Sequence, residues 1–220
     1  TDFKADQVLF SALSRGGLSL ISDNDYEKVR HGMGVIGSCG VGQFSESDLE
    51  KMLSGKRVGL SPYVSDVSEG MSGSCSPKDM EELFQLAHLF FTQPRQDEAA
   101  WEAYRNKRMS ITANVLSNPT SYYRSKWREF TSQPHLRNYK LPQDAEWAAT
   151  DYSKIHEVAK ERFANAGDFT FVVVGNFEEA ALISLIEMYL CPLPSGEKEN
   201  YKDVGLRPKK GKDELLVNKG

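Results

Sequence analysis

The chain has 220 residues, of which 40% are hydrophobic and 26% are charged, and its formal net charge is -4. These proportions are ordinary for a folded globular domain and exclude collagen-like, low-complexity and disordered chains. No apolar run approaches the roughly 18 residues of a membrane-spanning helix, and the acidic balance gives no basic footprint for nucleic acid. We therefore expect no membrane span and no nucleic-acid partner. Because the sequence begins at Thr1 without a Met, we expect a segment of a longer protein.

The chain opens with a predicted strand and a helix. From Val8 to Leu13 one face would carry Val8, Phe10 and Ala12 and the other Leu9, Ser11 and Leu13, which is typical of a strand, and the pair Gly16-Gly17 ends it in a turn. Asp23 or Asp25 is expected to cap a helix that runs through Ile36 into a cluster of glycines.

A short helix and a hairpin follow. Ser45 is a good N-cap for a helix that ends at Gly55, because its hydroxyl can accept a backbone N–H and acidic residues follow it. Residues 57–64 and 69–75 read as two strands, and residues 65–68 form the turn between them.

The middle of the chain is helical. A first helix opens at Ser76-Pro77, has apolar side chains at helical spacing and ends at Pro94. A longer helix starts at Asp97. A third starts at Pro119 and carries aromatic residues that predict a core-facing stripe rather than a nucleic-acid platform. The members of this stripe are Tyr122, Tyr123 and Trp127.

The last structured part contains a helix, a strand and another helix. The helix spans Asp151 to Ala164, and residues 169–174 are almost all apolar, which predicts a central strand buried on both faces. A final helix carries Leu182 and Tyr189, and the composition becomes polar beyond Pro192. The element order predicts an α+β fold, a two-layer sandwich with a mixed, largely antiparallel sheet and helices packed on it.

Histidines offer one weak metal motif. His156-Glu157 resembles the start of the zinc motif HExxH, but Lys160 stands where the second histidine belongs, and a cation there would repel zinc. A solvated helix face explains these residues better. His88 is expected in the core or at its boundary, packed without a metal partner, and His135 is expected in a loop.

Two further features have structural explanations. His31 precedes a glycine cluster, Gly32 to Gly42, which has no Lys and no preceding strand. It therefore predicts close helix packing and a helix end rather than a phosphate loop. The cysteines Cys39, Cys75 and Cys191 form no CxxC pair and predict three small buried residues.

The order of three motifs resembles the insulinase/pitrilysin family of zinc metallopeptidases. The segment from Phe3 to Ser19 resembles the start of the C-terminal half of the long bacterial members. Leu60-Ser61-Pro62-Tyr63 followed by residues 69–79 also resembles the start of that half, and residues 162–177 are similar to the family's closing strand and turn. The resemblance covers nearly all of residues 1–196.

The resemblance implies that the parent enzyme has two halves that close like a clamshell. It also implies that the first domain binds zinc through an HxxEH motif and a more distant Glu. The HxxEH segment corresponds here to Met33–Phe44, and the distant Glu falls near Ile111–Asn114. Neither window contains a His or a carboxylate. We therefore expect no zinc or other cofactor in this segment, with zinc bound in the N-terminal half of the parent, and assign no catalytic, metal-binding or substrate-binding residue to this chain.

The resemblance implies a noncatalytic domain, residues 1–196, that forms the opposing wall of a peptidase chamber, with residues 197–220 as a linker or the start of another element. The expected partners are peptide substrates and the N-terminal catalytic half of the same chain. The bacterial periplasm or cell envelope is the location expected for the parent. Two alternatives stay open: a structural or subunit-binding homologue of the same family, and an independent hydrolase that uses His156 and Glu157.

Overall fold

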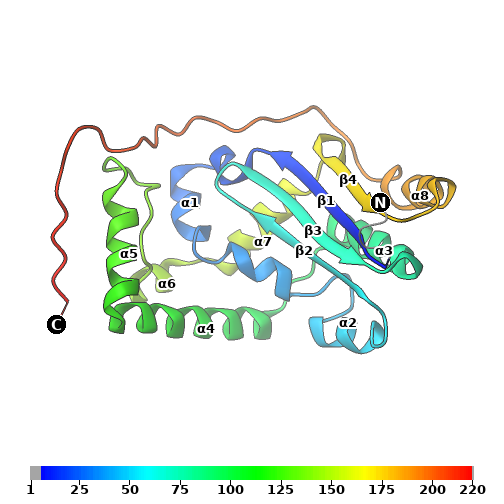
Figure 1. Ribbon diagram of the computed structural model, residues 1–220, viewed down its shortest axis with the longest axis horizontal. Helices are drawn as coiled ribbons and strands as arrows, with labels where there is room; N and C mark the ends of the chain where they lie inside the picture. Colours follow the sequence, from blue (N-terminus) through cyan, green and yellow to red (C-terminus); the bar gives the residue numbers. More distant parts are fainter. Residues whose placement is uncertain (1–5, 220) are drawn as a thin grey trace.

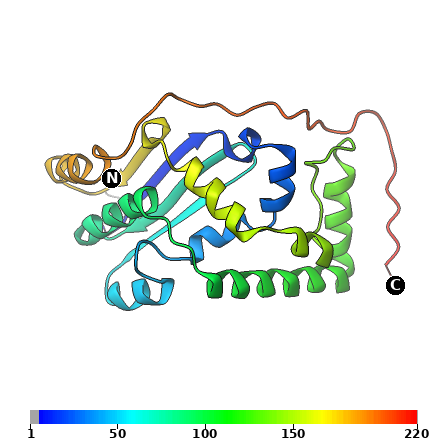
Figure 2. The same ribbon diagram turned by 180° about the vertical axis from the view of Figure 1, so that it is seen from behind.

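The computed structural model describes residues 6–219 and shows an antiparallel sheet with helices packed on one face (Figures 1 and 2). Phe3 to Ala5, the first residues of the opening motif, lie outside the described residues. The sheet order is β2-β3-β1-β4, and every neighbouring pair is antiparallel. The strands are β1 (Val8–Arg15), β2 (Val58–Val64), β3 (Ser68–Cys75) and β4 (Thr170–Gly175). The predicted α+β class is confirmed.

The helices follow the predicted order, with one addition. Short 3-10 turns connect several of them, and α6 lies between the predicted loop that contains His135 and the next predicted helix, where the sequence predicted no element. The helices are α1 (Asp23–Val29), α2 (Glu46–Met52), α3 (Met80–Thr92), α4 (Glu98–Ser117), α5 (Pro119–Phe130), α6 (Asp144–Ala149), α7 (Tyr152–Arg162) and α8 (Glu179–Leu185), which continues as a π-helical turn Ile186–Leu190.

Two apolar clusters hold the layers together. The inner face of β1 presents Val8, Phe10 and Ala12 to α3, where Phe84 meets Phe10 edge to face at 5.8 Å between ring centroids. A second cluster joins α1, α4, α6 and α7, and in it Trp101 stacks on Tyr152 at 5.3 Å. Burial of these side chains supplies the main folding energy, at about 1.5–3 kcal/mol for each large one.

The predicted hairpin and short capped helix are confirmed. Ser45 and Asp48 form a reciprocal capping box at the start of α2, which satisfies backbone N–H groups that the helix itself leaves without partners. The hairpin turn closes between Ser65 and Ser68.

The first helix is shorter than predicted and has a different cap. Ser22, rather than Asp23 or Asp25, accepts the backbone N–H of Asp25 at 3.1 Å. The helix ends at Val29, and a separate 3-10 helix, Met33–Ser38, contains the first part of the glycine cluster. Glycine disfavours a continuous α-helix and permits this tighter turn against its neighbours.

The prediction for residues 169–174 is wrong. β4 lies at an edge of the sheet and pairs with β1. Val172 and Val174 are 48% and 47% exposed on the outer face, while Val173 packs against the core. A nearly continuous apolar run fits a strand with one open apolar face as well as a strand covered on both faces.

The predicted core stripe on α5 is also wrong. Tyr123 and Trp127 are 46% and 48% exposed, and only Ser125 on this helix is buried. Helix α5 stands beyond the end of the sheet next to α4 (Figure 1), so one side of it faces away from both cores. Helical spacing defined the stripe but not which side the rest of the protein would cover.

The segment after residue 196 follows the surface from β4 and α8 toward α5 (Figure 1). Lys202 donates its backbone N–H to Ser19 at 2.9 Å, and Lys209 donates to the carbonyl of Thr131 at 2.8 Å. None of the helices in residues 6–219 has the length and apolar character needed to cross a bilayer.

Candidate functional site

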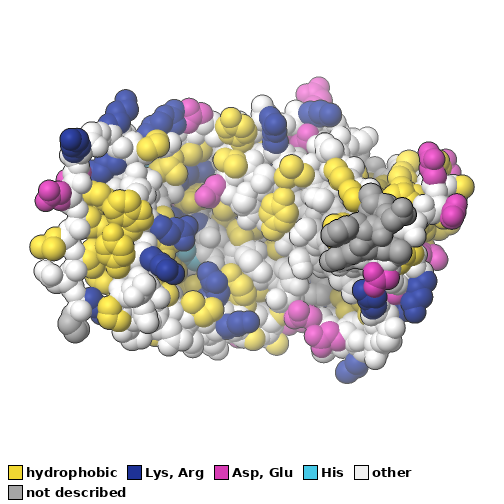
Figure 3. Space-filling model, viewed as in Figure 1, with side chains coloured by type: hydrophobic (Ala, Val, Ile, Leu, Met, Phe, Trp, Pro, Cys, Tyr) yellow, Lys and Arg dark blue, Asp and Glu magenta, His cyan; other side chains and the backbone are white. Residues whose placement is uncertain are grey.

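The two windows in which the resemblance leads us to expect the family's zinc-binding elements, Met33–Phe44 and Ile111–Asn114, both contribute residues to one cavity. Its volume is about 720 Å³, and its lining includes Met33 and Gly34 from the first window and Ile111 and Thr112 from the second. Figure 3 shows the hollow between the sheet and the end of the molecule formed by α4 and α5. These four residues offer a thioether, no side chain, an alkyl group and a hydroxyl, whereas zinc sites in proteins use His, Cys and carboxylates.

Close packing explains why the first window contains glycine. A methyl group on Gly32 would lie 2.2 Å from Cδ1 of Ile155, and one on Gly34 would lie 2.6 Å from the Tyr104 hydroxyl. A larger side chain at either position must displace its neighbour. The predicted role in close packing is therefore confirmed for these glycines, although Gly34 lies in a 3-10 helix and Gly32 directly precedes it.

The lining of this cavity is strongly basic. Among the described residues, five cationic side chains line it, and Asp66 is the one carboxylate in the lining. In the whole chain, by contrast, Asp and Glu outnumber Lys and Arg by 31 to 27. We call it the arginine cavity after its cations, which are Arg30, Arg108, Arg128, Arg137 and Lys140. Figure 3 shows Lys and Arg side chains gathered around the hollow.

Three of the five cations build the walls. The buried Arg137 donates to the carbonyls of Leu18 and Ile21 at 2.7 and 2.8 Å and to the Asp23 carboxylate at 2.8 Å. Arg30 bonds Glu27 and two carbonyls of the loop before α6. Lys140 pairs with Glu146. Sequence reasoning predicted only a loop here, because nothing local indicates that Arg137 reaches back to the first turn.

The same cavity perturbs two titratable groups. Burial and the nearby Arg30 charge lower the pKa of His31 to about 4, so this imidazole is neutral at pH 7. Burial and the Asp66 carboxylate raise the pKa of Tyr26 to about 12. His31 is half-buried and forms part of the cavity lining.

The His156 motif does not assemble a metal site in the described residues. Glu157 pairs with Lys154 at 2.8 Å on the exposed side of α7. His156 is half-buried beside Cys39 and Tyr152 at a small apolar pocket, and burial with the Lys160 charge lowers its pKa. The predicted solvated helix face is confirmed for Glu157, whereas the half-buried position of His156 at an apolar pocket corrects the prediction for that residue.

The remaining histidines and cysteines have ordinary surroundings. His88 is half-buried and its Nδ1 lies 2.8 Å from the Tyr189 carbonyl, whereas His135 lies in the loop before α6. Cys39 and Cys75 are buried as predicted, but Cys191 is exposed at the turn after α8, which corrects the prediction for that residue.

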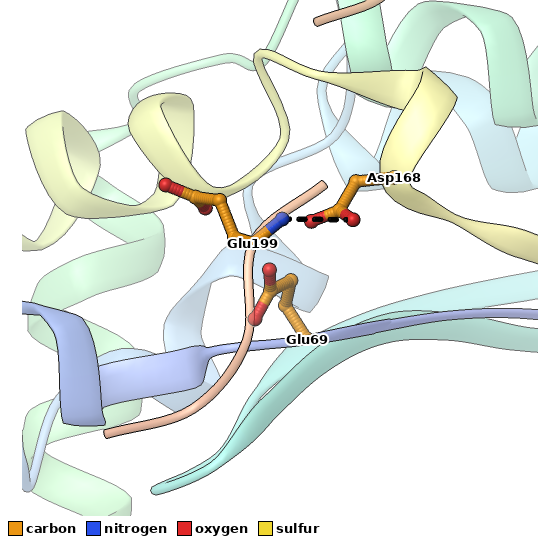
Figure 4. Close-up of side chains that lie close together, drawn as sticks. All are labelled: Glu69, Asp168 and Glu199. Carbon is orange, nitrogen blue, oxygen red and sulfur yellow. Dashed lines mark hydrogen bonds between the residues drawn. The ribbon is translucent and has the colours of Figure 1, made fainter. Parts of the chain in front are cut away.

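Within residues 6–219, one group of three potential metal ligands does come together, and it combines Glu69, Asp168 and Glu199 (Figure 4). Their carboxylate oxygens lie within 4.8 Å of one another, and such oxygens suit Mg²⁺ or Ca²⁺. Each of the three carboxylates already accepts a hydrogen bond within the fold, including one from the Ser14 hydroxyl to Asp168. Arg162 donates to Glu199 at 2.8 Å, and Glu69 accepts the backbone N–H of Gly17 at 2.6 Å.

This carboxylate group therefore has a structural explanation. The Glu199 backbone N–H donates to Asp168 at 3.1 Å, which ties the C-terminal segment to the turn before β4 (Figure 4). Burial raises the pKa of Glu69, whose side chain is inside the fold. The network anchors chain segments distant in sequence, and we assign it no metal.

Comparison with known proteins identifies relatives of this chain. It is 26% identical over 196 residues to "Probable zinc protease PqqL" of Haemophilus influenzae, which covers 89% of this chain and 21% of the relative. It is 26% identical over 161 residues to the Escherichia coli protein of the same name, with 71% and 16% covered. No protein-family model matches the chain.

A solved structure shows the same fold. The periplasmic protease PqqL from Escherichia coli superposes with a TM-score of 0.72 and 23% identity, and the match covers 93% of this chain and 22% of that one. The chain thus spans about a fifth of the length of the curated relatives it matches. These similarities confirm the resemblance indicated by the motifs: the relatives are zinc proteases of the insulinase/pitrilysin type.

Proposed function

We propose that residues 1–196 form a noncatalytic domain of a zinc metallopeptidase and that residues 197–220 link it to the rest of the parent chain. One observation carries the proposal. The windows that correspond to HxxEH and to the distant Glu meet at a single cavity, and the residues they contribute to it, Met33, Gly34, Ile111 and Thr112, are not zinc ligands.

The fold of this domain has a source of stability that is independent of a metal. Its two apolar clusters connect the sheet to α3 and join α1, α4, α6 and α7. The window that would carry a zinc motif is instead packed at Gly32 and Gly34 against α7 and α4. Loss of metal ligands therefore leaves the architecture intact, and the domain serves as a wall.

A wall contributes to peptidase action through enclosure. Closing a chamber around a peptide excludes water and larger proteins from the catalytic site. In this proposal zinc is bound in the N-terminal half of the parent, hydrolysis occurs there, peptides are the substrates, and the present domain faces that half. The similarity of this chain to the periplasmic protease PqqL supports the bacterial periplasm or cell envelope as the location of the parent.

A second candidate is a structural or subunit-binding homologue. The exposed Tyr123 and Trp127 on α5 favour it, since exposed aromatic side chains are common in protein interfaces. The parent sequence separates the two candidates, because an HxxEH motif upstream in the same chain supports the peptidase.

Metal content and activity test the proposal. After chelation and reconstitution with zinc at pH 7, the purified 220-residue chain should retain no stoichiometric zinc and cleave no peptide. His156→Ala is the matched variant, and it should behave as the wild type. One tightly held zinc per chain contradicts the proposal, and if His156→Ala then abolishes both zinc and cleavage, the independent hydrolase is correct.

A further inference from the structure

Two cations of the arginine cavity are not committed to a carboxylate in the described part of the chain. Arg108 lies on α4, and its guanidinium carbon is 6.0 Å from the centre of the Tyr104 ring. Arg128 lies on α5, and its guanidinium carbon is 3.9 Å from the centre of the Tyr139 ring. Both side chains are exposed, in contrast to Arg30 and Arg137. Their N–H donors are therefore available to a ligand.

Within residues 6–219, the unpaired positive charge of the cavity is that of these two arginines. Arg30, Arg137 and Lys140 line the same cavity, but each already pairs with a carboxylate, and Asp66 is the one acidic residue in the described lining. A concave wall of one charge sign raises the local concentration of oppositely charged ligands. Each guanidinium also presents a planar set of donors that matches a carboxylate.

The placement of the two arginines indicates the shape of the ligand. Arg108 lies near the middle of α4 and Arg128 near the far end of α5, and the two helices diverge from their junction at Asn118 (Figure 1). One compact anion is therefore a poorer match than a chain with separated charges. The volume of about 720 Å³ falls within the range of pockets that enclose a ligand. Tyr104 and Tyr139, which are half-buried, add aromatic surface for the apolar parts of such a chain.

We propose that the arginine cavity binds an acidic peptide segment, whose carboxylates pair with Arg108 and Arg128. This deepens the proposed function, on which it rests, by giving the chamber wall a preference for acidic stretches of substrate. The other three cations maintain the walls through their carboxylate partners, and Arg30 and Arg137 also do so through backbone carbonyls.

Peptide binding to the 220-residue chain tests this proposal without any zinc-bearing partner. The probe is a short fluorescent Glu-Gly repeat peptide, and the matching Gln-Gly peptide is the neutral control. The Glu-Gly peptide should bind, the Gln-Gly peptide should not, and affinity should fall as salt rises because exposed charges are screened. Arg108→Gln with Arg128→Gln should weaken binding by about tenfold or more, equivalent to about 1.4 kcal/mol.

Arg124→Gln is the control variant, since Arg124 is exposed on α5 outside the cavity lining. It should bind as the wild type does. Arg108→Glu with Arg128→Glu should reverse the preference toward a Lys-Gly peptide, which a merely destabilised protein cannot do.

Three results overturn the proposal: equal binding of both peptides, unchanged affinity in the double Gln variant, or equal weakening by Arg124→Gln. Competition by inorganic phosphate as effective as that of the Glu-Gly peptide overturns the peptide as ligand class. Failure here, combined with no zinc and no cleavage by the chain, leaves the noncatalytic wall standing and removes only its acidic preference.

Discussion

Among the buried residues outside the two apolar clusters, we expect Arg137 to be one whose substitution lowers the free energy of unfolding most. Its guanidinium connects the loop before α6 to the carbonyls of Leu18 and Ile21 and to Asp23. In Arg137→Met the side chain keeps much of its apolar stem but loses every donor. The Asp23 side chain is 65% exposed and returns to water, so the cost comes mainly from the two carbonyls.

The magnitude follows from these contacts. An unsatisfied buried polar group costs about 1–3 kcal/mol, and the Leu18 carbonyl is the more buried of the two. Loss of the guanidinium from the Tyr26 ring, now 4.5 Å from its centre, adds about 0.5–1 kcal/mol. We expect Arg137→Met to lower the free energy of unfolding by about 3 kcal/mol in total, or about 6–12 °C in Tm for a chain of this size.

Urea unfolding followed by circular dichroism measures this effect. Arg137→Lys should fall between the wild type and Arg137→Met, because one ammonium cannot reach both carbonyls and Asp23. Arg15→Met is the control at an exposed strand position and should change stability by less than about 0.5 kcal/mol. If the free energy of unfolding of Arg137→Met is within about 1 kcal/mol of the wild-type value, the assigned role of Arg137 is refuted. This threshold is set above the ~0.5 kcal/mol scatter of surface substitutions.

The other predictions concern the strand, the glycines and a histidine. Val173→Asp, which points to the core, should lose about 2–3 kcal/mol of unfolding free energy, and Val172→Asp on the open face less than about 1 kcal/mol; equal losses in urea melts contradict the edge placement of β4. Gly32→Ala should cost about 1–3 kcal/mol through overpacking, whereas Gly37→Ala, with 3.9 Å of clearance, should be near neutral; reversed effects refute the packing explanation. The pKa of His31 is lowered to about 4 in the fold, so the unfolded chain takes up this proton first and stability is lost as pH falls from about 6.5 toward 4. After discounting for partial exposure, the loss is about 1–2 kcal/mol, and His31→Gln should remove that part of the pH dependence; an identical pH profile in the variant contradicts it.

Local sequence signals predicted the elements that depend on near neighbours. β1, the hairpin β2–β3 and the cap of α2 involve residues a few positions apart or a clear alternation, and all were predicted correctly. The cap of α1 was missed because Ser22, Asp23 and Asp25 are all good caps, and only the backbone conformation selects Ser22.

The errors share another cause. Whether β4 lies inside the sheet, and whether Trp127 on α5 is covered, depends on contacts between segments far apart in the chain. The same limit applies to the candidate site. Sequence comparison with the family drew attention to Met33–Phe44 and Ile111–Asn114, but the bond from Arg137 to the first turn spans 119 positions and has no local signal.

The central claim is that this domain completes a peptidase chamber whose chemistry is elsewhere, and reconstitution tests it most directly. Peptide cleavage by a separately expressed N-terminal, zinc-bearing half of the parent should rise when the whole C-terminal half is added. A C-terminal half that lacks residues 1–196 should fail to produce the rise. Full activity of the N-terminal half alone, or zinc-dependent cleavage by the 220-residue chain, would contradict the account.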